Sequence, residues 1–162
     1  YKRQVDYYGM VKNIITKKII EDHDKAYNLR LFGCFGIDEE KQRLFRSTYT
    51  NLIGDRHAEI VQDKFMDYFY SQDVGRVIDF IIENHGTIPE RDINLCYSAK
   101  YKLSEYAHRI KKLTMSENDV IILKEELGKS YTGSNERLKR FNLPLCGLEK
   151  GIQECLTSWN KF

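Results

Sequence analysis

Short runs of β-branched and aromatic residues alternate along this chain with longer segments in which apolar residues recur every three or four positions. The first pattern is typical of strands and the second of amphipathic helices. Strands that are separated by helices of about ten to fifteen residues favour parallel pairing. The sequence therefore predicts an α/β fold in one integrated unit, with a more irregular helical part towards the C-terminus.

The boundaries of these segments follow from apolar stripes, capping residues and glycines. Helices are expected over residues 5–21, 38–52, 72–84, 103–113, 134–140 and 148–159, and strands over 28–35, 57–61, 67–70 and 93–97. Residues 120–123 fit either a strand or the start of a helix. Asp38 is the expected N-cap of the second helix. The stripe of the first helix is expected to comprise Tyr8, Val11, Ile15 and Ile19, and that of the third Val74, Val77, Ile78, Ile81 and Ile82.

Charge and hydropathy argue against two classes of partner. The 26 Lys and Arg residues nearly cancel the 24 Asp and Glu residues, and both signs are interspersed. The chain therefore lacks the clustered basic surface on which nucleic-acid binding rests. No apolar run approaches the roughly 20 residues that span a bilayer. With 41% hydrophobic residues the chain can build a packed core, so a globular protein with neither nucleic acid nor membrane as partner is expected.

Cysteine and histidine usage indicates a reducing compartment and no metal site. The cysteines form no C-x-x-C pair and have no histidine at zinc-finger spacing, and no two histidines are arranged as H-x-x-x-H. We expect buried free thiols and a cytoplasmic protein. The aromatic run 68–70 is explained by alternation on a half-buried strand rather than by base stacking. The cysteines are Cys34, Cys96, Cys146 and Cys155.

Tyr8 and Lys12 are the residues most suited to acid/base chemistry. Four positions apart on the first expected helix, their phenol and ammonium groups share one face about one turn apart. The pKa of a free tyrosine is near 10, and a cation within roughly 4–6 Å lowers it by favouring the phenolate. Spacing alone does not establish this role, because among 11 tyrosines one Tyr-x-x-x-Lys is expected by chance. An amphipathic helix with a snorkelling lysine explains the same pattern.

The order of segments after Lys12 resembles the extended short-chain dehydrogenases/reductases, the family of NAD-dependent nucleotide-sugar epimerases and dehydratases. There the Tyr-x-x-x-Lys helix precedes a strand L-R-x-F-N-x-x-G, which residues 29–36 (LRLFGCFG) match apart from the Asn. Some thirty residues later, residues 66–74 (MDYFYSQDV) resemble the motif R-D-F/Y-I-x-V-x-D-V/L. Three further segments resemble family motifs in the same order, namely residues 94–96, 102–107 and 148–152.

The resemblance implies the C-terminal part of a Rossmann-type parallel sheet, with a small, mostly helical substrate-binding portion. It implies NAD or NADP as cofactor and a nucleotide-sugar as substrate. Tyr8 would be the general acid/base, and Lys12 would lower the pKa of Tyr8 and hold the nicotinamide ribose. Phe32 would pack beside the nicotinamide, while Gly33 and Cys34 would line the nucleotide-sugar pocket. Family members commonly form homodimers through the Tyr-x-x-x-Lys helix, so a homodimer is also implied.

The resemblance also divides the chain. Residues 1–55 would form the end of the Rossmann-type domain, and residues 56–162 a mixed segment in which its last elements interleave with the substrate-binding portion. The fingerprint G-x-x-G-x-x-G and the catalytic Ser or Thr that precede the Tyr in the family do not occur upstream of Tyr8. Residues 1–6 contain neither an initiator Met nor an apolar stretch. We therefore expect the N-terminal dinucleotide-binding half to be the missing partner, and the 162 residues alone to be inactive.

Two substitutions depart from the family pattern. Gly33 stands where the family has an Asn that contacts the substrate diphosphate, and Met66 where an Arg often grips it. Losing a bidentate cation removes a strong charge-assisted contact, so Lys64 or Arg137 would have to hold the phosphates beside Met66. These departures also leave open a degenerate, non-catalytic relative that binds a nucleotide or a protein.

Overall fold

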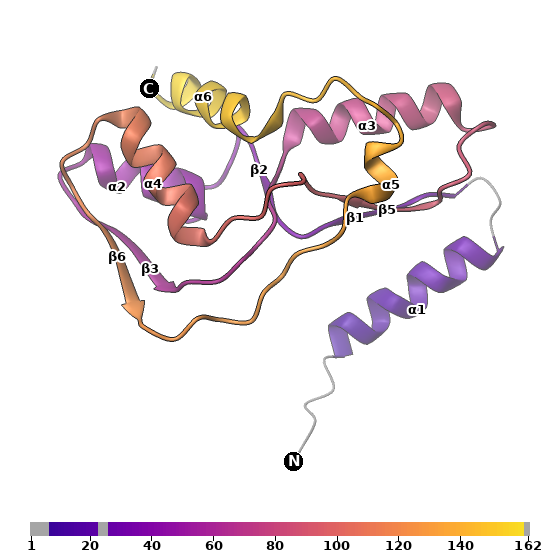
Figure 1. The fold of residues 1–162 in the computed structure, drawn as a ribbon, viewed down its shortest axis with the longest axis horizontal. Helices are drawn as coiled ribbons and strands as arrows, with labels where there is room; N and C mark the ends of the chain where they lie inside the picture. The colour runs from indigo at the N-terminus through magenta and orange to yellow at the C-terminus, as the bar shows by residue number, and fades with distance from the viewer. Residues whose placement is uncertain (1–6, 23–25, 161–162) are drawn as a thin grey trace, which may run out of the picture.

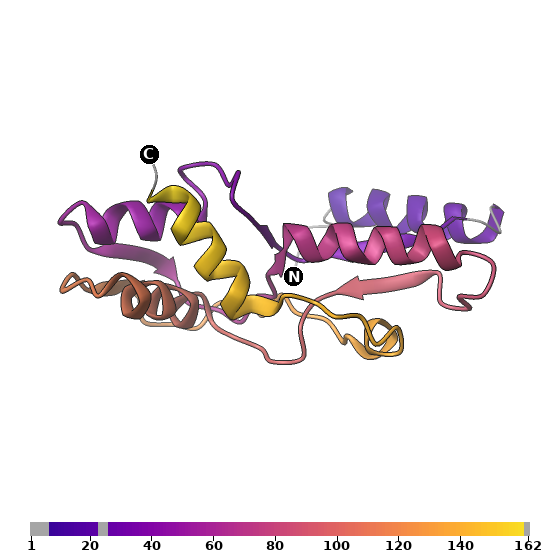
Figure 2. The same ribbon diagram turned by 90° about the horizontal axis from the view of Figure 1, so that it is seen from above.

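A computed structural model describes residues 7–22 and 26–160 of the chain, and the side chains of Tyr8 and Asp22 lie outside this description. The elements in chain order are α1 (Tyr7–Asp22), β1 (Asn28–Leu31), β2 (Cys34–Phe35), α2 (Leu44–Ile53), β3 (Ala58–Gln62), β4 (Phe69–Tyr70), α3 (Ser71–Asn84), β5 (Asp92–Leu95), α4 (Leu103–Thr114), β6 (Val120–Lys124), α5 (Glu136–Lys139) and α6 (Gly147–Trp159). They form two lobes along the long axis (Figure 1). One lobe holds α2, α4, α6, β3 and β6, and the other holds α3, α5, β1 and β5 with α1 beside β1 (Figures 1 and 2).

The strands pair in three separate two-stranded parallel sheets. β1 pairs with β5 from Asn28 opposite Asp92, and β2 pairs with β4 from Cys34 opposite Phe69. β3 pairs with β6, with Ala58 opposite Val120. Helices connect the paired strands, as parallel pairing requires. The predicted α/β class with parallel pairing is therefore confirmed, and the ambiguous segment 120–123 is a strand.

The single strand expected over residues 28–35 is wrong, because the chain forms two strands there. Gly33 lies between them, and its carbonyl accepts a hydrogen bond from the Phe69 N–H at 3.0 Å. A Cβ atom at Gly33 would stand 2.7 Å from the ring of Tyr68. The glycine thus lets the backbone leave its partner β5 and pass close to Tyr68 before it pairs with β4.

The helix expected over residues 38–52 begins only at Leu44, and Asp38 is not its N-cap. Arg43 occupies the N-cap position and makes no side-chain cap bond. Instead, the carboxylate of Glu39 accepts a hydrogen bond from the Arg46 N–H at 3.0 Å. Residues 37–43 form turns that close on Gly36 and Glu40 carbonyls. These turns compete with the helix for the same backbone groups, and this competition delays its start.

The other expected helices are present as α1, α3, α4, α5 and α6, each within a few residues of the predicted bounds. Residues 5 and 6 of the first expected helix lie outside the described part of the chain. In α3, Val77 and Ile81 are buried, whereas Ile78 and Ile82 are 41% and 65% exposed. The core stripe of α3 is therefore narrower than predicted, since this helix covers its lobe from one side.

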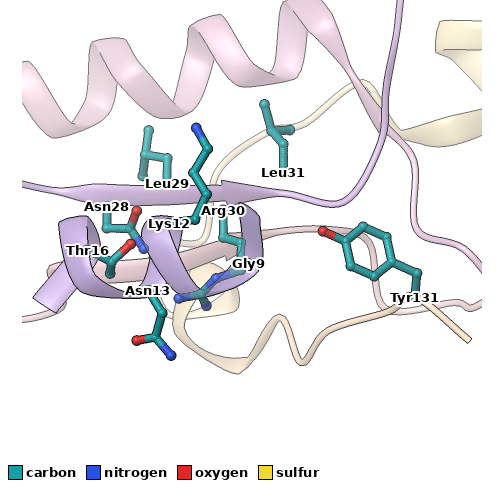
Figure 3. Close-up of a pocket in the computed structure, with 9 residues that line it drawn as sticks. All are labelled: Gly9, Lys12, Asn13, Thr16, Asn28, Leu29, Arg30, Leu31 and Tyr131. Atoms are coloured by element: carbon teal, nitrogen blue, oxygen red, sulfur yellow. The ribbon is translucent and has the colours of Figure 1, made fainter. Parts of the chain in front are cut away.

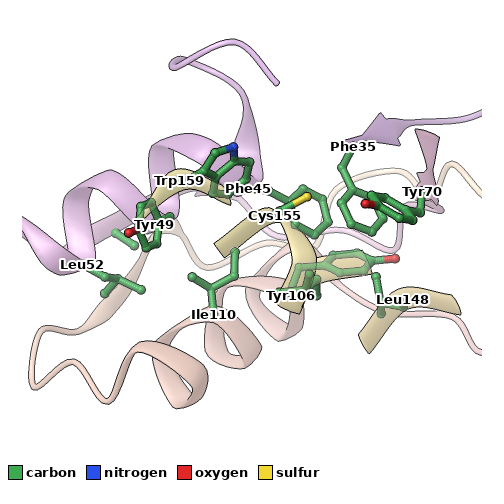
Figure 4. Close-up of a cluster of buried hydrophobic side chains, with 12 residues drawn as sticks. Phe35, Phe45, Tyr49, Leu52, Tyr70, Tyr106, Ile110, Leu148, Cys155 and Trp159 are labelled. Carbon is green, nitrogen blue, oxygen red and sulfur yellow. The ribbon is translucent and has the colours of Figure 1, made fainter. Parts of the chain in front are cut away.

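An aromatic core fills the lobe of α2, α4 and α6 (Figure 4). Phe35 stacks on Phe45 with ring centroids 4.3 Å apart and an interplanar angle of 11°. Tyr106 meets Tyr68 edge-on at 5.3 Å. Offset-stacked and edge-on pairs satisfy the ring quadrupoles and add to the energy of area burial. The buried members are Phe35, Phe45, Tyr49, Leu52, Ala58, Tyr70, Tyr106, Ile110, Leu148, Ile152, Cys155 and Trp159.

A second, smaller core lies in the other lobe, where α3 and α5 pack on the β1–β5 pair. Its buried members are Phe69, Val77, Ile81, Ile93, Leu95 and Leu138. The half-buried ring of Tyr97 packs against this core and against the aromatic core. Tyr97 therefore connects the two lobes through packing.

A buried carboxylate also connects the two lobes. Asp73, in the first turn of α3, is fully buried and accepts hydrogen bonds from the Tyr97 hydroxyl at 2.6 Å and from Arg76 at 2.8 Å. It also accepts the N–H groups of Cys146 and Gly147, at 2.7 and 2.9 Å. These two N–H groups open α6, where an anion is favoured by the helix dipole. Asp73 thus holds the N-terminus of α6 against the start of α3.

All four cysteines are free thiols. Cys96 and Cys155 are buried, as predicted, but Cys34, which lines a cavity of about 320 Å³, and Cys146 are only half-buried. Among residues 7–22 and 26–160, no helix is long and apolar enough to cross a bilayer.

Candidate active site

Helix α1 and strand β1 enclose a cavity of about 700 Å³, termed here the α1–β1 cavity. Figure 3 shows the helix along one side of it and the strand along the other. Its lining residues are Gly9, Lys12, Asn13 and Thr16 from α1, Asn28, Leu29, Arg30 and Leu31 from β1, and Tyr131. The cavity reaches the carboxyl end of β1, where parallel α/β sheets bind ligands.

The face of α1 that lines the cavity is polar, and its apolar face points elsewhere. Val11, Ile15 and Ile19, which were predicted to form a stripe, are 50%, 48% and 37% exposed. The stripe exists in the sequence, but in these residues it is not buried against the described part of the chain. Small and polar side chains face β1 instead, which leaves room for the cavity and supplies hydrogen-bonding groups to it.

Arg30 connects the strand wall of the cavity to charged neighbours. In the parallel register Arg30 lies opposite Asn94, and its guanidinium donates to the Asn94 side-chain oxygen at 2.7 Å. It also forms an ion pair with Asp92 at 3.1 Å. Because these partners lie on β5, the pairing fixes Arg30 at the border of the cavity. The sequence motif included Arg30, but nothing in the pattern indicated that it lines a cavity.

Tyr131 lies at the far end of the cavity from Thr16 (Figure 3) and comes from residues 126–133, which we call the strap. Its N–H donates to the Phe65 carbonyl at 2.8 Å, and its carbonyl accepts the Asp67 N–H at 3.1 Å. The Tyr131 ring meets Phe32 edge-on, with centroids 5.1 Å apart. Sequence reasoning missed Tyr131, since the strap has no periodic pattern that would have placed it.

Asp67 holds the strap in position. Its buried carboxylate accepts the Gly133 N–H at 2.8 Å and forms an ion pair with Lys100 at 2.7 Å. Pairing with a cation and a backbone donor compensates the cost of burying this charge. The strap, and with it Tyr131, is therefore fixed by a buried side chain between the lobes.

Of the predicted catalytic pair, Lys12 lines the α1–β1 cavity, and Figure 3 shows its side chain extending from α1 towards β1. Tyr8 lies one turn earlier on the same helix, but its side chain is outside the described part of the structure. Phe32, predicted beside the nicotinamide, directly follows β1 and contacts Tyr131. The structure thus brings Lys12, the end of β1 and Tyr131 to one cavity.

The predicted substrate residues Gly33 and Cys34 do not line this cavity. Gly33 packs under the ring of Tyr68. Cys34 lines a different cavity of about 320 Å³, where burial raises the pKa of its thiol. Burial likewise raises the pKa of Tyr68 to about 12, which keeps the phenol neutral.

The three residues predicted near the substrate phosphates are also apart from the α1–β1 cavity. The backbone N–H of Lys64 donates to the Asp63 carboxylate, and the backbone carbonyl of Met66 accepts a hydrogen bond from the Tyr106 hydroxyl. Arg137 donates to the Asp92 carbonyl at 2.5 Å. Arg137 and the cavity-lining Arg30 are both paired with Asp92.

No group of three or more His, Cys, Asp or Glu side chains in the described segments could hold a metal ion. His57, His85 and His108 are exposed, and His23 lies outside those segments.

No protein-family profile and no curated protein sequence matches the chain. Its fold matches solved structures. A UDP-glucuronic acid 4-epimerase from Bacillus cereus, solved with a substrate analogue and NAD, aligns at a TM-score of 0.73 and 17% identity. A Thermus thermophilus UDP-glucose 4-epimerase in complex with NAD aligns at 0.71 and 12%, and an epimerase from Methanothermobacter thermautotrophicus at 0.70 and 16%.

These alignments cover 93%, 92% and 91% of this chain but only 50%, 51% and 47% of the respective solved chains. The chain therefore spans about half the length of the proteins it matches. It has the fold of the C-terminal part of Rossmann-type nucleotide-sugar epimerases. At the level of fold, the resemblance inferred from the sequence motifs is confirmed.

Proposed function

We propose that this chain is the C-terminal part of a nucleotide-sugar epimerase, dehydratase or reductase that uses bound NAD or NADP. The observation that carries the proposal is Lys12, which lines the α1–β1 cavity one helical turn after Tyr8. The fold shared with NAD-containing epimerases supports it. The four free thiols fit a protein of the reducing cytoplasm.

The residues of the cavity fit the nicotinamide end of a dinucleotide. Lys12 would offer an ammonium to ribose hydroxyls, and the cavity of about 700 Å³ has room for the ring and its ribose. Phe32 does not line the cavity itself, but it directly follows β1 and contacts the lining residue Tyr131. When bound, the nicotinamide supplies hydride exchange with a carbon of the sugar. The remaining chemistry is proton transfer, which the chain itself provides.

In this proposal Tyr8 moves the proton. Its phenol oxygen would take a proton from a sugar hydroxyl, or return one to a keto oxygen, as the sugar is oxidised or reduced. Lys12 would lower the pKa of Tyr8, because an ammonium close to the phenol favours the phenolate. Residues four apart on a helix lie on neighbouring turns of one face, so α1 alone sets the spacing of the pair.

We further propose that the N-terminal half of the same protein covers α1 and β1. β1 pairs with β5 alone among the described strands, and a two-stranded sheet is marginal in stability. Val11, Ile14 and Ile15 are about half-exposed on α1. Additional strands beside β1 would extend the sheet and supply the phosphate-binding turn at a helix N-terminus. The outer face of α1 would remain for a homodimer.

A non-catalytic relative that binds a nucleotide or a protein is the second candidate. Gly33 favours it, since the family's Asn in this position could not be accommodated unless the Tyr68 ring, 2.7 Å from a Cβ atom, moved. Met66 favours it too, because its side chain replaces a cation. A protein of this kind would bind the phosphates of a nucleotide weakly and would show no turnover.

The decisive experiment uses the full-length protein and a panel of nucleotide-sugars. Thermal-shift titration identifies the substrate, since a ligand that binds only the folded state raises the Tm. Turnover of that substrate is then measured in wild type and in Tyr8→Phe. The enzyme proposal expects turnover to fall at least a hundredfold, the scale of general acid/base catalysis, with cofactor binding retained. Binding without turnover in wild type would establish the second candidate, and unchanged turnover in Tyr8→Phe would refute the role of Tyr8.

A further inference from the structure

Glu39 lies in residues 37–43, the segment between β2 and α2, and only one of its carboxylate oxygens is used. Oε2 accepts the N–H of Arg46 in the first turn of α2. Oε1 is buried and has no hydrogen-bond partner among the described residues. It is the only buried side-chain polar atom of the described chain in this condition. Leaving a buried acceptor without a donor costs free energy. Burial of this oxygen therefore destabilises the carboxylate form of Glu39.

Every element that packs near Glu39 contributes groups to its surroundings. Arg43, the last residue of the segment, and Arg46 in α2 supply positive charge to Glu39. The other charged residues of the segment are Asp38, Glu40 and Lys41, all of them exposed. Three uncharged groups also lie near Glu39: the thiol of Cys34 on β2, the thiol of Cys155 on α6 and the phenol of Tyr68 before β4. Burial is the largest cause that raises the pKa of each of them. In the described part of the chain, Arg43 and Arg46 are the cations that act on the Glu39 carboxyl.

The pKa of Glu39 is raised to about 7, mainly by burial, against the opposing effect of the Arg46 N–H and of Arg43. A neutral carboxyl carries its own hydrogen and loses far less on burial than a carboxylate. If the segment opened, water would solvate the carboxylate and its pKa would return to about 4.5. Closed and open segments therefore bind the proton with different affinity, which couples opening to pH.

The segment is held to the rest of the lobe by few contacts. The Trp159 indole N–H donates to the Ile37 carbonyl at 2.7 Å, and the Arg46 N–H of α2 donates to Glu39 at 3.0 Å. Residues 37, 38 and 40–43 are exposed. Segment 37–43 also forms one wall of the 320 Å³ cavity, whose other wall includes Cys34 and Ser71. Movement of the segment would open this cavity.

We propose that Glu39 is a proton-operated latch: segment 37–43 stays packed in place while the buried Glu39 carboxyl is neutral, and ionisation of this carboxyl releases the segment and opens the cavity beside Cys34. The latch acts at a place separate from the α1–β1 cavity. It does not depend on the cofactor chemistry proposed above.

Amide hydrogen exchange of the full-length protein, read by mass spectrometry in peptides covering residues 36–46, tests the latch. Rates at pH 6 and pH 8 are corrected for intrinsic exchange and expressed as protection factors. A closed-state pKa of about 7 and an open-state value of about 4.5 give an opening equilibrium that rises about tenfold between these pH values. Protection of this segment should therefore fall about tenfold in wild type and stay constant in Glu39→Gln.

Glu40→Gln is the matched control, because Glu40 is exposed in the same segment and its side chain accepts a hydrogen bond from the neighbouring Gln42 side chain. This variant removes the same charge and should keep the tenfold pH dependence. Equal protection of wild type at both pH values, or equal pH dependence in Glu39→Gln, would overturn the latch. If Glu39→Gln does not fold, carbon-13 NMR titration of the Glu39 carboxyl in wild type decides, since a pKa near 4.5 contradicts the proposal.

Discussion

Gly133 lies so close to Phe32 that a Cβ atom on Gly133 would stand 2.4 Å from Phe32 Cζ. This contact joins the strap to the end of β1, on the side where the strap presents Tyr131 to the α1–β1 cavity. The absence of a side chain at Gly133 is therefore a condition for the shape of the cavity.

Gly133→Ala should destabilise the protein by about 1–3 kcal/mol, the usual cost of forcing extra atoms into a packed contact. The Phe32 ring would have to shift to admit the methyl group, and the Asn94 amide would also lie only 3.0 Å from it. Urea unfolding measures the loss. Gly86→Ala is the control, since nothing lies within 4 Å of its added Cβ, and its effect should stay within about 0.5 kcal/mol. Equal stability of the two variants would contradict the contact.

Asp73→Asn should cost about 2–4 kcal/mol, although it preserves the shape of the side chain. Oδ1 accepts from Arg76 and the Cys146 N–H, and Oδ2 from Tyr97 and the Gly147 N–H. In either orientation the new amide would turn its NH₂ group towards two donors.

The free energy of unfolding from urea titration checks the Asp73 prediction. Asp79→Asn is the matched control, because Asp79 is exposed on the same helix, and it should change stability by less than about 0.5 kcal/mol. A loss below 1 kcal/mol in Asp73→Asn would show that the junction of α3 and α6 does not depend on this carboxylate.

The fold was predictable where local patterns agree with tertiary packing. α3, α4 and α6 each carry an apolar stripe that meets a core, so periodicity placed them well. The prediction of a single strand over 28–35 was wrong because the chain turns at Gly33, so that β1 pairs with β5 and β2 pairs with β4. The predicted start of α2 was wrong because residues 37–43 form two short turns, closed by the Gly36 and Glu40 carbonyls, although Asp38 and the acidic residues after it fit the pattern of a helix start equally well.

The candidate site was predictable only in part, for a related reason. Lys12 follows from helix periodicity, which sets the face of α1 but not what that face meets. Val11 and Ile15 read as core residues and are exposed, since periodicity does not say whether a partner covers the stripe. Tyr131 lies in an irregular strap whose position depends on Asp67, 64 residues earlier. Contacts of that range leave no periodic trace in a single sequence.

Lys12→Met in the full-length protein should weaken binding of the dinucleotide about tenfold or more, because a hydrogen bond from a charged group contributes about 1.5–3 kcal/mol. Fluorescence or calorimetric titration with NAD and NADP measures the affinity. Lys17→Met is the control, since Lys17 is exposed on the same helix and does not line the α1–β1 cavity. If both variants bind as wild type does, Lys12 does not hold the cofactor.

Glu39→Gln should become progressively more stable than wild type as pH rises. The pKa of Glu39 is about 7 in the folded protein and about 4.5 when solvated, so the folded state holds a proton that the unfolded state has released. Below pH 4.5 both states are protonated and burial of the group costs little. Between pH 4.5 and 7 the unfolded state gains from ionising first, so wild type loses stability, and above pH 7 the loss is complete.

Unfolding free energies at pH 5, 6, 7 and 8 check this prediction through the difference between Glu39→Gln and wild type. Subtracting wild type removes every other titrating group that the two proteins share. The difference should grow from pH 5 to 7 and level off by pH 8, whereas for Glu40→Gln it should stay flat, because Glu40 is exposed. A flat difference for Glu39→Gln would mean that the folded protein holds an ionised Glu39 without penalty, and that its buried oxygen has a donor in solution.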